Sequence, residues 1–291
     1  MVIKLNYKII TVIFLILFIL FLSPSLLNIG KHPVTAAETS TDAPIRIPII
    51  LYHEIRPSHL NNMSITPWDF ESDLKFLKKS GYTAINMSDL IGYVNGKGSL
   101  PDHPVMITFD DGYLNDYVYA YPLIKKYGVK IVLSVIGKNT EDFSNVSDSN
   151  LDYAHVTWKQ LNEMSDSGFI EIQNHTYNLH SITRKRFGCE KSKSESVGQY
   201  QDLLRNDLSK CQNLISSNTG QLPTTFAYPY GSISKEALPV IKSLGFQATF
   251  SCSYGINKIT KNPAELYGLK RITRYHGRPL QRTMKECDKL K

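Results

Sequence analysis

The sequence predicts an α/β fold of barrel type, in which a closed or nearly closed ring of parallel strands is surrounded by helices. Short apolar runs and amphipathic helical patterns alternate in one unbroken series from residue 46 to about residue 275, as is typical of parallel sheets. The chain has 291 residues, 42% of them hydrophobic and 20% charged, so it can form a globular core. No Gly-x-Gly-x-x-Gly motif follows the first strand, which removes the main signature of dinucleotide binding. A doubly wound open sheet is the alternative architecture.

The predicted elements follow each other in a regular order. Seven apolar runs predict strands at residues 46–52, 105–109, 130–136, 169–173, 224–228, 247–251 and 269–273. Five amphipathic segments predict helices at residues 67–80, 115–127, 157–167, 198–217 and 234–244. The first helix has Thr66 as its N-cap and Pro67 at its first position. The third begins with a Thr157–Gln160 capping box.

Residues 1–30 are predicted to be a signal peptide or a membrane anchor. Lys4 and Lys8 precede an apolar run of 14 residues at 9–22, which reaches 21 residues when it is counted to residue 29. Cleaved secretion and an uncleaved anchor both remain open, and in either case the lysines before the run place the remainder outside the cell. Residues 31–45 are expected to be a linker, residues 46–276 the folded domain and residues 277–291 a C-terminal tail.

The positive charge of the chain does not indicate nucleic-acid binding. The formal charge is +7, from 33 basic and 26 acidic residues, and Lys4, Lys8 and Lys31 precede any acidic residue. Without the first 36 residues, 30 basic residues face 26 acidic ones, a charge of +4. No basic block with interleaved aromatic residues remains, so a nucleic-acid partner is not expected.

The cysteines are spaced like neither a zinc ribbon nor a redox motif. Outside the cytoplasm they could pair, but the sequence does not say how. The four residues are Cys189, Cys211, Cys252 and Cys287.

Chemically versatile side chains gather where the predicted strands end. In parallel β/α folds the carboxyl ends of the strands form the functional site. Four of these ends carry such groups, in the segments 52–54 (YHE), 110–112 (DDG), 174–180 (NHTYNLH) and 229–231 (PYG). Each segment alone is more often a turn or a packed side chain. Their occurrence together at successive strand ends predicts a site.

One aspartate and two histidines from these segments form a donor set that suits Zn²⁺ and leaves room for water and substrate. Adjacent side chains on a pleated strand point to opposite faces, so Asp110 and Asp111 can share one site only if the chain turns there. One carboxylate would then bind the metal, while the other would lie beside the bound water as a general base.

Three segments resemble the polysaccharide deacetylases of carbohydrate esterase family 4, the NodB-like domain. They are TFDDG at 108–112, the histidine pair of HTYNLH at 175–180 and FAYPYG at 226–231. The resemblance covers about residues 46–275 and implies a single distorted, incomplete (β/α) barrel. The histidine spacing is one residue longer than is usual in the family, and the first strand ends in Leu51-Tyr52-His53. Both features resemble the branch that deacetylates poly-β-1,6-N-acetylglucosamine in biofilm matrix, whose members are secreted or surface-attached.

The resemblance implies a role for each matching residue. Asp111, His175 and His180 would bind a divalent metal, for which we expect Zn²⁺, and Asp110 would be the general base. His53 would be the catalytic acid, with His276 as its rival, and the backbone N–H of Tyr230 would help to hold the oxyanion. The third motif lacks the arginine that often orients the base, which leaves Arg271 as a candidate partner of Asp110 or as a structural ion pair.

The function implied is metal-dependent hydrolysis of N-acetyl groups from an extracellular N-acetylglucosamine polymer, by a secreted protein or by one held to the membrane by its N-terminal segment. The alternatives are the same chemistry on peptidoglycan or chitin, or a non-catalytic carbohydrate-binding module on the same fold. A zinc protease is not expected because the sequence contains no H-E-x-x-H motif.

Overall fold

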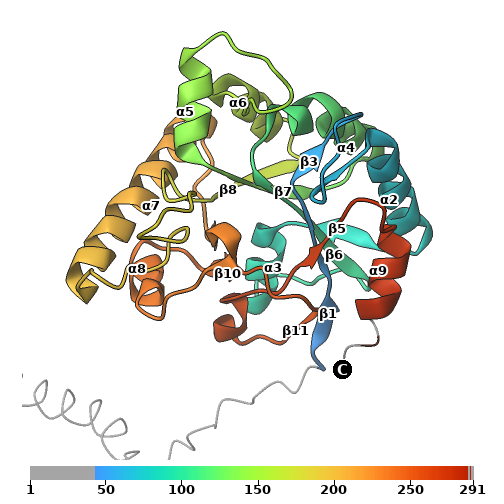
Figure 1. Ribbon diagram of the computed structural model, residues 1–291. Coiled ribbons are helices and arrows are strands. Elements are labelled where there is room, and N and C mark those ends of the chain that lie inside the picture. Colours follow the sequence, from blue (N-terminus) through green and yellow to red (C-terminus); the bar gives the residue numbers. More distant parts are fainter. Residues whose placement is uncertain (1–42, 288, 290–291) are drawn as a thin grey trace, which may run out of the picture. The chain divides into compact units, whose positions relative to one another are not determined.

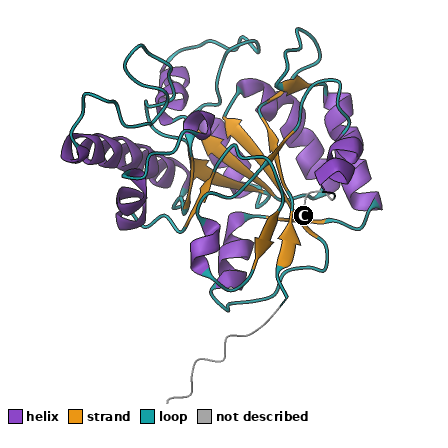
Figure 2. Ribbon diagram, turned by 60° about the horizontal axis from the view of Figure 1, so that its bottom comes forward, coloured by secondary structure: helices purple, strands orange, loops and turns teal. Residues whose placement is uncertain are grey.

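A parallel sheet runs through the middle of the domain, and helices surround it (Figures 1 and 2). The computed structural model describes residues 43–287 and 289. The predicted leader and nearly all of the linker lie outside these residues. Within the described part of the chain, no helix is long and apolar enough to cross a membrane.

The main sheet has eight strands in the order β10-β9-β8-β7-β6-β2-β12, with β5 paired to β6 beside that path. All of its ladders are parallel. The strands are β2 (Ile49–Tyr52), β5 (Thr83–Ile85), β6 (Pro104–Asp111), β7 (Ile131–Val135), β8 (Ile170–Asn174), β9 (Thr225–Ala227), β10 (Ala248–Phe250) and β12 (Ile272–Thr273).

The two ends of this sheet approach each other through a single bridge. The N–H of Ser251, just after β10, donates to the carbonyl oxygen of Leu269, and the N–H of Leu269 donates to that of Thr249. Leu269 precedes β12 at the other end of the sheet. The expected distorted, incomplete (β/α) barrel is therefore confirmed.

The helices begin where the sequence provides caps. Thr66, Asn86, Thr157 and Ser196 form capping boxes before α2, α3, α6 and α7. The α-helices are α2 (Pro67–Lys79), α3 (Met87–Val94), α4 (Tyr121–Tyr127), α5 (Gly137–Asn145), α6 (Trp158–Asp166), α7 (Val197–Thr219), α8 (Ala237–Ser243) and α9 (Leu280–Cys287). A π-helical turn, η1 (Asp116–Ala120), precedes α4, and two 3-10 turns are η2 (Pro229–Gly231) and η3 (Pro263–Leu266).

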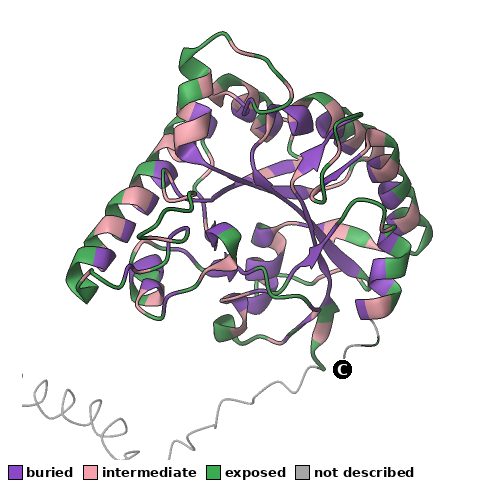
Figure 3. Cartoon of the chain, in the orientation of Figure 1, coloured by how far each residue is buried: buried purple, intermediate pink, exposed green. Residues whose placement is uncertain are grey.

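The core lies between the strands and the inward faces of the helices (Figure 3). All eight residues of β6 are buried, as expected for a strand covered on both faces. The stripe on α7 that faces the sheet contains Tyr200, Leu204, Leu208, Cys211 and Ile215, all fully buried. This periodicity confirms the long helix expected there.

The first predicted strand, at 46–52, is two strands. Pro48 lacks an N–H and cannot continue a ladder as a donor, so the chain changes partners at this residue. Before it, β1 (Ile45–Ile47) pairs in antiparallel fashion with β11 (Asn257–Ile259). After it, β2 joins the main sheet beside β6. A second small sheet joins β3 (Glu54–Ile55) to β4 (Ser64–Ile65).

The segment expected to be a C-terminal tail contains a packed helix. Leu280, Met284 and Cys287 of α9 are buried in the largest core cluster. The helix is amphipathic but short, and it follows a loop, so its sequence alone did not separate it from an exposed end. The packed body of the domain therefore extends at least to Cys287.

Candidate active site

The three predicted metal ligands meet at the carboxyl ends of β6 and β8, two strands that flank β7 in the sheet. Asp111 ends β6, and His175 and His180 follow β8. One ligand atom from each lies within 4.8 Å of the others. Asp111 Oδ1 is 3.3 Å from Nε2 of His175 and 3.2 Å from Nε2 of His180. All three side chains are largely buried, so the group is shielded from bulk water.

The chain turns sharply at Asp111, which lets both aspartates face the same site. Asp111 has a φ of 72° and Gly112 a φ of 76°, so the alternation of the strand ends at this point. A left-handed non-glycine residue costs about 1 kcal/mol or more and persists only where its surroundings impose it. The turn resolves the conflict that the sequence raises between two adjacent inward-facing carboxylates.

The two histidines present Nε2 to the carboxylate because their other nitrogens are engaged. Nδ1 of His175 donates to the carbonyl oxygen of Ala227 at 2.8 Å. Nδ1 of His180 lies 3.3 Å from the hydroxyl of Tyr230. In a neutral His175 ring, Nε2 then carries no hydrogen, and its lone pair points at Oδ1 of Asp111. Such second contacts orient metal-binding imidazoles.

The donor set fits a divalent cation. Oδ1 of Asp111 is buried without a hydrogen-bond donor, and the two Nε2 atoms approach it. Two imidazole nitrogens and one carboxylate are the ligands that suit catalytic zinc. Without a cation, a proton on a histidine relieves the repulsion among these acceptors. Burial lowers the pKa of His175, but the charges of Asp110 and Asp111 outweigh burial, so the pKa lies above its ordinary value. For His180, burial and the charge of His175 lower the pKa to about 4.

The loop between the two histidines is held by the neighbouring helix. Asp207 of α7 accepts the N–H groups of Tyr177 and Asn178, each at 2.8 Å. Thr176 has a φ of 74°, and its N–H donates to the side chain of Asn174. Asn174 opens the strand-end segment 174–180 noted in the sequence, although no role was assigned to it there. Asp207 was missed because it lies on a long helix far along the chain and carries no local signal.

Asp110 is clamped by Arg271. The two guanidinium nitrogens of Arg271 donate to the two carboxylate oxygens at 2.8 and 2.7 Å, and both side chains are buried. Nε of Arg271 donates to the carbonyl oxygen of Ser251. Burial raises the pKa of Asp110, but Arg271, with His175, outweighs this and holds the pKa below its ordinary value. The third motif lacks an arginine, and this distant one pairs with Asp110.

His53 lies among the same charges, whereas His276 lies apart from them. His53 follows β2 and is half-buried, and its Nδ1 is buried without a hydrogen-bond partner. Burial lowers the pKa of His53, and the charges of Asp111 and Asp110 oppose this. His276 is exposed in the loop before α9, where its backbone N–H donates to the carbonyl oxygen of Asn62.

Tyr230 borders the site on a strained turn. Its φ is 56° and that of Gly231 is 68°. A Cβ on Gly231 would lie 2.6 Å from the Cβ of Cys252, so only glycine fits there. The Tyr230 ring lies 4.5 Å from that of His180 and 5.1 Å from that of Phe187, centroid to centroid. Both Tyr230 and Phe187 remain about two-fifths exposed, so an aromatic surface borders the Asp111-His175-His180 group.

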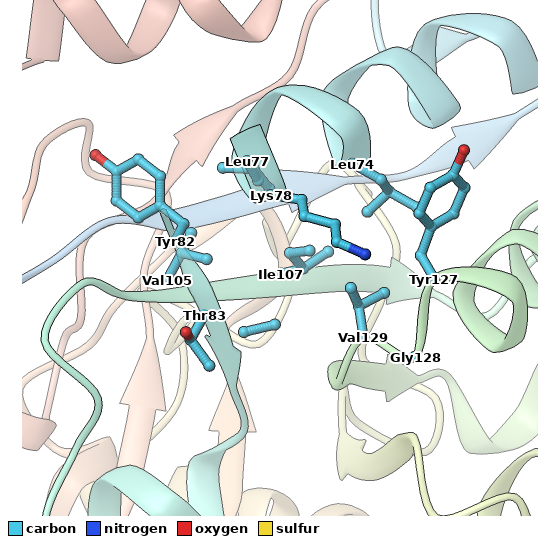
Figure 4. Close-up of a pocket in the computed structure, with 11 residues that line it drawn as sticks. Leu74, Leu77, Lys78, Tyr82, Thr83, Val105, Ile107, Tyr127, Gly128 and Val129 are labelled. Carbon is cyan, nitrogen blue, oxygen red and sulfur yellow. The ribbon is translucent and has the colours of Figure 1, made fainter. Parts of the chain in front are cut away.

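A pocket of about 210 Å³ lies at the opposite ends of the strands and takes no part in this site (Figure 4). Its walls come from the end of α2, the starts of β5 and β6, and the turn between α4 and β7. It is lined mainly by apolar side chains, with Lys78 as its charged group. Functional groups of β/α barrels lie at the carboxyl ends of strands, so this pocket has no bearing on the chemistry.

A (β/α) barrel with a buried Asp-His-His group and a clamped second carboxylate at its strand ends has the layout of a metal-dependent hydrolase. The sequence pattern of the polysaccharide deacetylase family matches residues 97–249, more than half of the chain. The protein therefore belongs to the polysaccharide deacetylase family, as the resemblance of its motifs implies.

Similar proteins agree with this assignment. The poly-β-1,6-N-acetyl-D-glucosamine N-deacetylase of Staphylococcus aureus strain MSSA476 is 28% identical over 280 residues, covering 88% of this chain and 89% of that protein. A de-N-acetylase from Aggregatibacter actinomycetemcomitans superposes with a TM-score of 0.69 at 27% identity, over 79% of this chain and 95% of that one. IcaB from Ammonifex degensii has the same fold, with a TM-score of 0.68 at 24% identity, covering 82% of this chain and 96% of that one.

Proposed function

We propose that this enzyme hydrolyses N-acetyl groups of an extracellular N-acetylglucosamine polymer, with poly-β-1,6-N-acetylglucosamine of biofilm matrix as the substrate. The observation that carries the proposal is the Asp111-His175-His180 group beside the Asp110–Arg271 pair. The substrate is inferred from the Staphylococcus aureus relative, whose name states that polymer. Secretion, or attachment to the membrane through residues 1–30, would place the enzyme where such a polymer accumulates.

In this proposal Asp111, His175 and His180 hold a divalent metal, for which Zn²⁺ is the natural choice. A metal bound there supplies Lewis-acid activation of a water and of the acetyl carbonyl. Asp110 takes the proton of that water, and Arg271 keeps this carboxylate ionised and oriented. The Tyr230 N–H donates to the oxygen that becomes negative.

The leaving group needs a proton, which we assign to His53. A protonated His53 passes its proton to the sugar nitrogen as the C–N bond breaks, giving acetate and a glucosamine residue. Its position among Asp110, Asp111 and His175 supports this role over His276. The exposed rings of Tyr230 and Phe187 would contact the sugar beside the metal ligands.

The test is acetate release from poly-β-1,6-N-acetylglucosamine, chitin oligomers and peptidoglycan, each with and without a chelator. We expect release that the chelator abolishes and added Zn²⁺ restores, with the β-1,6-linked polymer as the preferred substrate. Preference for chitin or peptidoglycan would leave the chemistry in place and overturn the substrate. No chelator-sensitive release from any polymer would favour a carbohydrate-binding module.

Variants in the same assay separate the proposed roles. Asp110→Asn should bind metal as the wild type does and lose at least 100-fold in acetate release, because a general base contributes about that much or more. Asp202→Asn, an exposed change on α7, is the matched control. His53→Gln should release acetate much more slowly than the wild type, whereas His276→Gln should remain active. The reverse result would assign the catalytic acid to His276.

A further inference from the structure

A fourth histidine, His155, lies against the turn that carries Asp111 and has no part in the chemistry proposed above. It is buried in the segment that connects α5 to α6 (Figure 1). Its Nδ1 is 3.2 Å from the carbonyl oxygen of Asp111, and its Nε2 is 2.9 Å from Nδ2 of Asn139 on α5. Its ring stacks on that of Tyr113, with 4.7 Å between the centroids and 25° between the planes.

These contacts define one form of the His155 ring. A carbonyl oxygen only accepts, so Nδ1 must carry the hydrogen that points to Asp111. An amide nitrogen only donates, so Nε2 must be the acceptor for Asn139. Both contacts are satisfied together by the neutral ring with its hydrogen on Nδ1. Asn139 therefore sets the ring so that it donates to the Asp111 backbone.

The backbone on both sides of this contact is bound to the same segment. The N–H of Val156 donates to the carbonyl oxygen of Gly112 at 2.9 Å, and the N–H of Leu114 donates to that of Ala154 at 2.8 Å. His155 lies between these two bonds, opposite Tyr113. The carbonyl of Asp111 also accepts the N–H of Ile136, at a longer 3.4 Å. The left-handed conformation of Asp111 is thus held from the His155 side, and also by the N–H of Gly112, which donates to the carbonyl oxygen of Asp110 at 2.9 Å.

We propose that His155 is a positioning residue, which fixes the Asp111 carboxylate toward His175 and His180 through the Asp111 backbone. The inference rests on the metal role proposed for these three residues. A left-handed non-glycine residue keeps its conformation only when neighbouring groups impose it, and His155 is the side chain that binds this carbonyl. Contacts of this kind, one step behind the ligands, strongly affect metal affinity.

The decisive variant is His155→Phe, which keeps an aromatic ring against Tyr113 and removes both hydrogen bonds. We expect the dissociation constant for Zn²⁺, measured by competition with a chromophoric chelator, to rise about 10- to 100-fold. The visible absorption spectrum of the Co²⁺-substituted protein should change as well, because it reports ligand geometry. The melting temperature of the metal-free protein should fall only slightly, by less than would account for the loss of Zn²⁺ affinity.

His103→Phe is the matched control, because it makes the same substitution at an exposed histidine that precedes β6, at the other end of the strand. It should leave the Zn²⁺ affinity and the Co²⁺ spectrum unchanged. Wild-type affinity and spectrum in His155→Phe would overturn the proposal. A fall in the metal-free melting temperature that accounts for the whole loss of affinity would also overturn it, since the role would then be structural.

Asn139→Leu provides a second test if His155→Phe does not fold. This variant removes the donor to Nε2 and leaves His155 in place. The hydrogen of the neutral ring is then no longer fixed on Nδ1 and can move to Nε2. We expect weaker Zn²⁺ binding than in the wild type, and wild-type binding would count against the proposal. Failure of the wild type itself to bind Zn²⁺ would instead reject the metal site of the proposed function, which separates the two claims.

Discussion

Two adjacent aspartates are given different tasks by the residues that surround them. Asp110 receives two hydrogen bonds from Arg271, which holds its carboxylate ionised and in one orientation. Asp111 receives no such pair, and its Oδ1 is left facing two histidine nitrogens. The same side chain is therefore suited to accept a proton in one position and to bind a cation in the next.

Arg271 should control the pH dependence of the reaction. Asp110 must be ionised to act as the proposed base, so kcat/KM should fall as the pH drops through its pKa. Arg271→Met removes the cation that lowers this pKa while burial still raises it, so the acidic limb should move to higher pH. Removing one partner of a buried pair should also cost about 3–5 kcal/mol of stability.

The measurement is a pH profile of kcat/KM at saturating metal, together with urea unfolding. Arg271→Lys keeps the charge but not the two parallel hydrogen bonds. It should therefore show a smaller shift of the acidic limb than Arg271→Met. Equal profiles for the wild type and both variants would show that Arg271 is a structural ion pair only.

Helix α7 supports the loop after β8 at the scale of secondary-structure elements. Its apolar stripe fixes it against the sheet, and Asp207 on the same helix accepts two backbone N–H groups of the loop. His175 is anchored separately, through the carbonyl of Ala227. The position of His180 thus depends on the packing of a helix some 30 residues further along the chain.

Asp207→Ala should loosen His180 more than His175. Two backbone N–H groups would lose their acceptors, a cost of about 1–3 kcal/mol where such groups are buried. We expect weaker Zn²⁺ binding and a lower kcat, measured by chelator competition and acetate release. Asp202→Asn on the exposed side of the helix should change neither quantity. Unchanged metal affinity in Asp207→Ala would mean that the loop keeps its shape without this contact.

Residues near the C-terminus complete the molecule as a whole. Arg271 follows the segment that bridges the two ends of the sheet, and Arg274 forms a buried ion pair with Asp73 of α2. Helix α9 then adds Leu280 to the core. The barrel and the site are thus completed by the last part of the described chain.

Leu280→Ala should destabilise the fold by about 2–5 kcal/mol, because it removes a fully buried side chain and leaves a cavity. Leu280 is not among the groups that contact the site, so kcat at a temperature where the variant is folded should equal that of the wild type. Thermal unfolding and acetate release together check this. The exposed neighbour change Gln281→Ala should alter neither. A loss of kcat without a loss of stability would contradict this separation.

Local patterns were sufficient for most strands and helices. Periodic apolar residues located α7 and the buried strands, and the capping residues Thr66 and Thr157 located helix starts. Short elements were missed, including β5 and α3, although Asn86 and Asp89 form a capping box that the sequence contains. The small sheets were missed because two- or three-residue strands depend on their partners rather than on a pattern of their own.

The sequence by itself determined the alternating β/α fold and the side chains at the strand ends, because short continuous apolar runs predict buried parallel strands and their ends. The tertiary structure alone decided how Asp110 and Asp111 share one site, since this depends on a left-handed turn at Asp111. It also decided that Arg271 clamps Asp110 and that His155 supports Asp111. The Arg271–Asp110 contact joins residues that are 161 positions apart in the sequence, and the His155–Asp111 contact joins residues that are 44 positions apart. No local pattern encodes which distant side chains a barrel brings together.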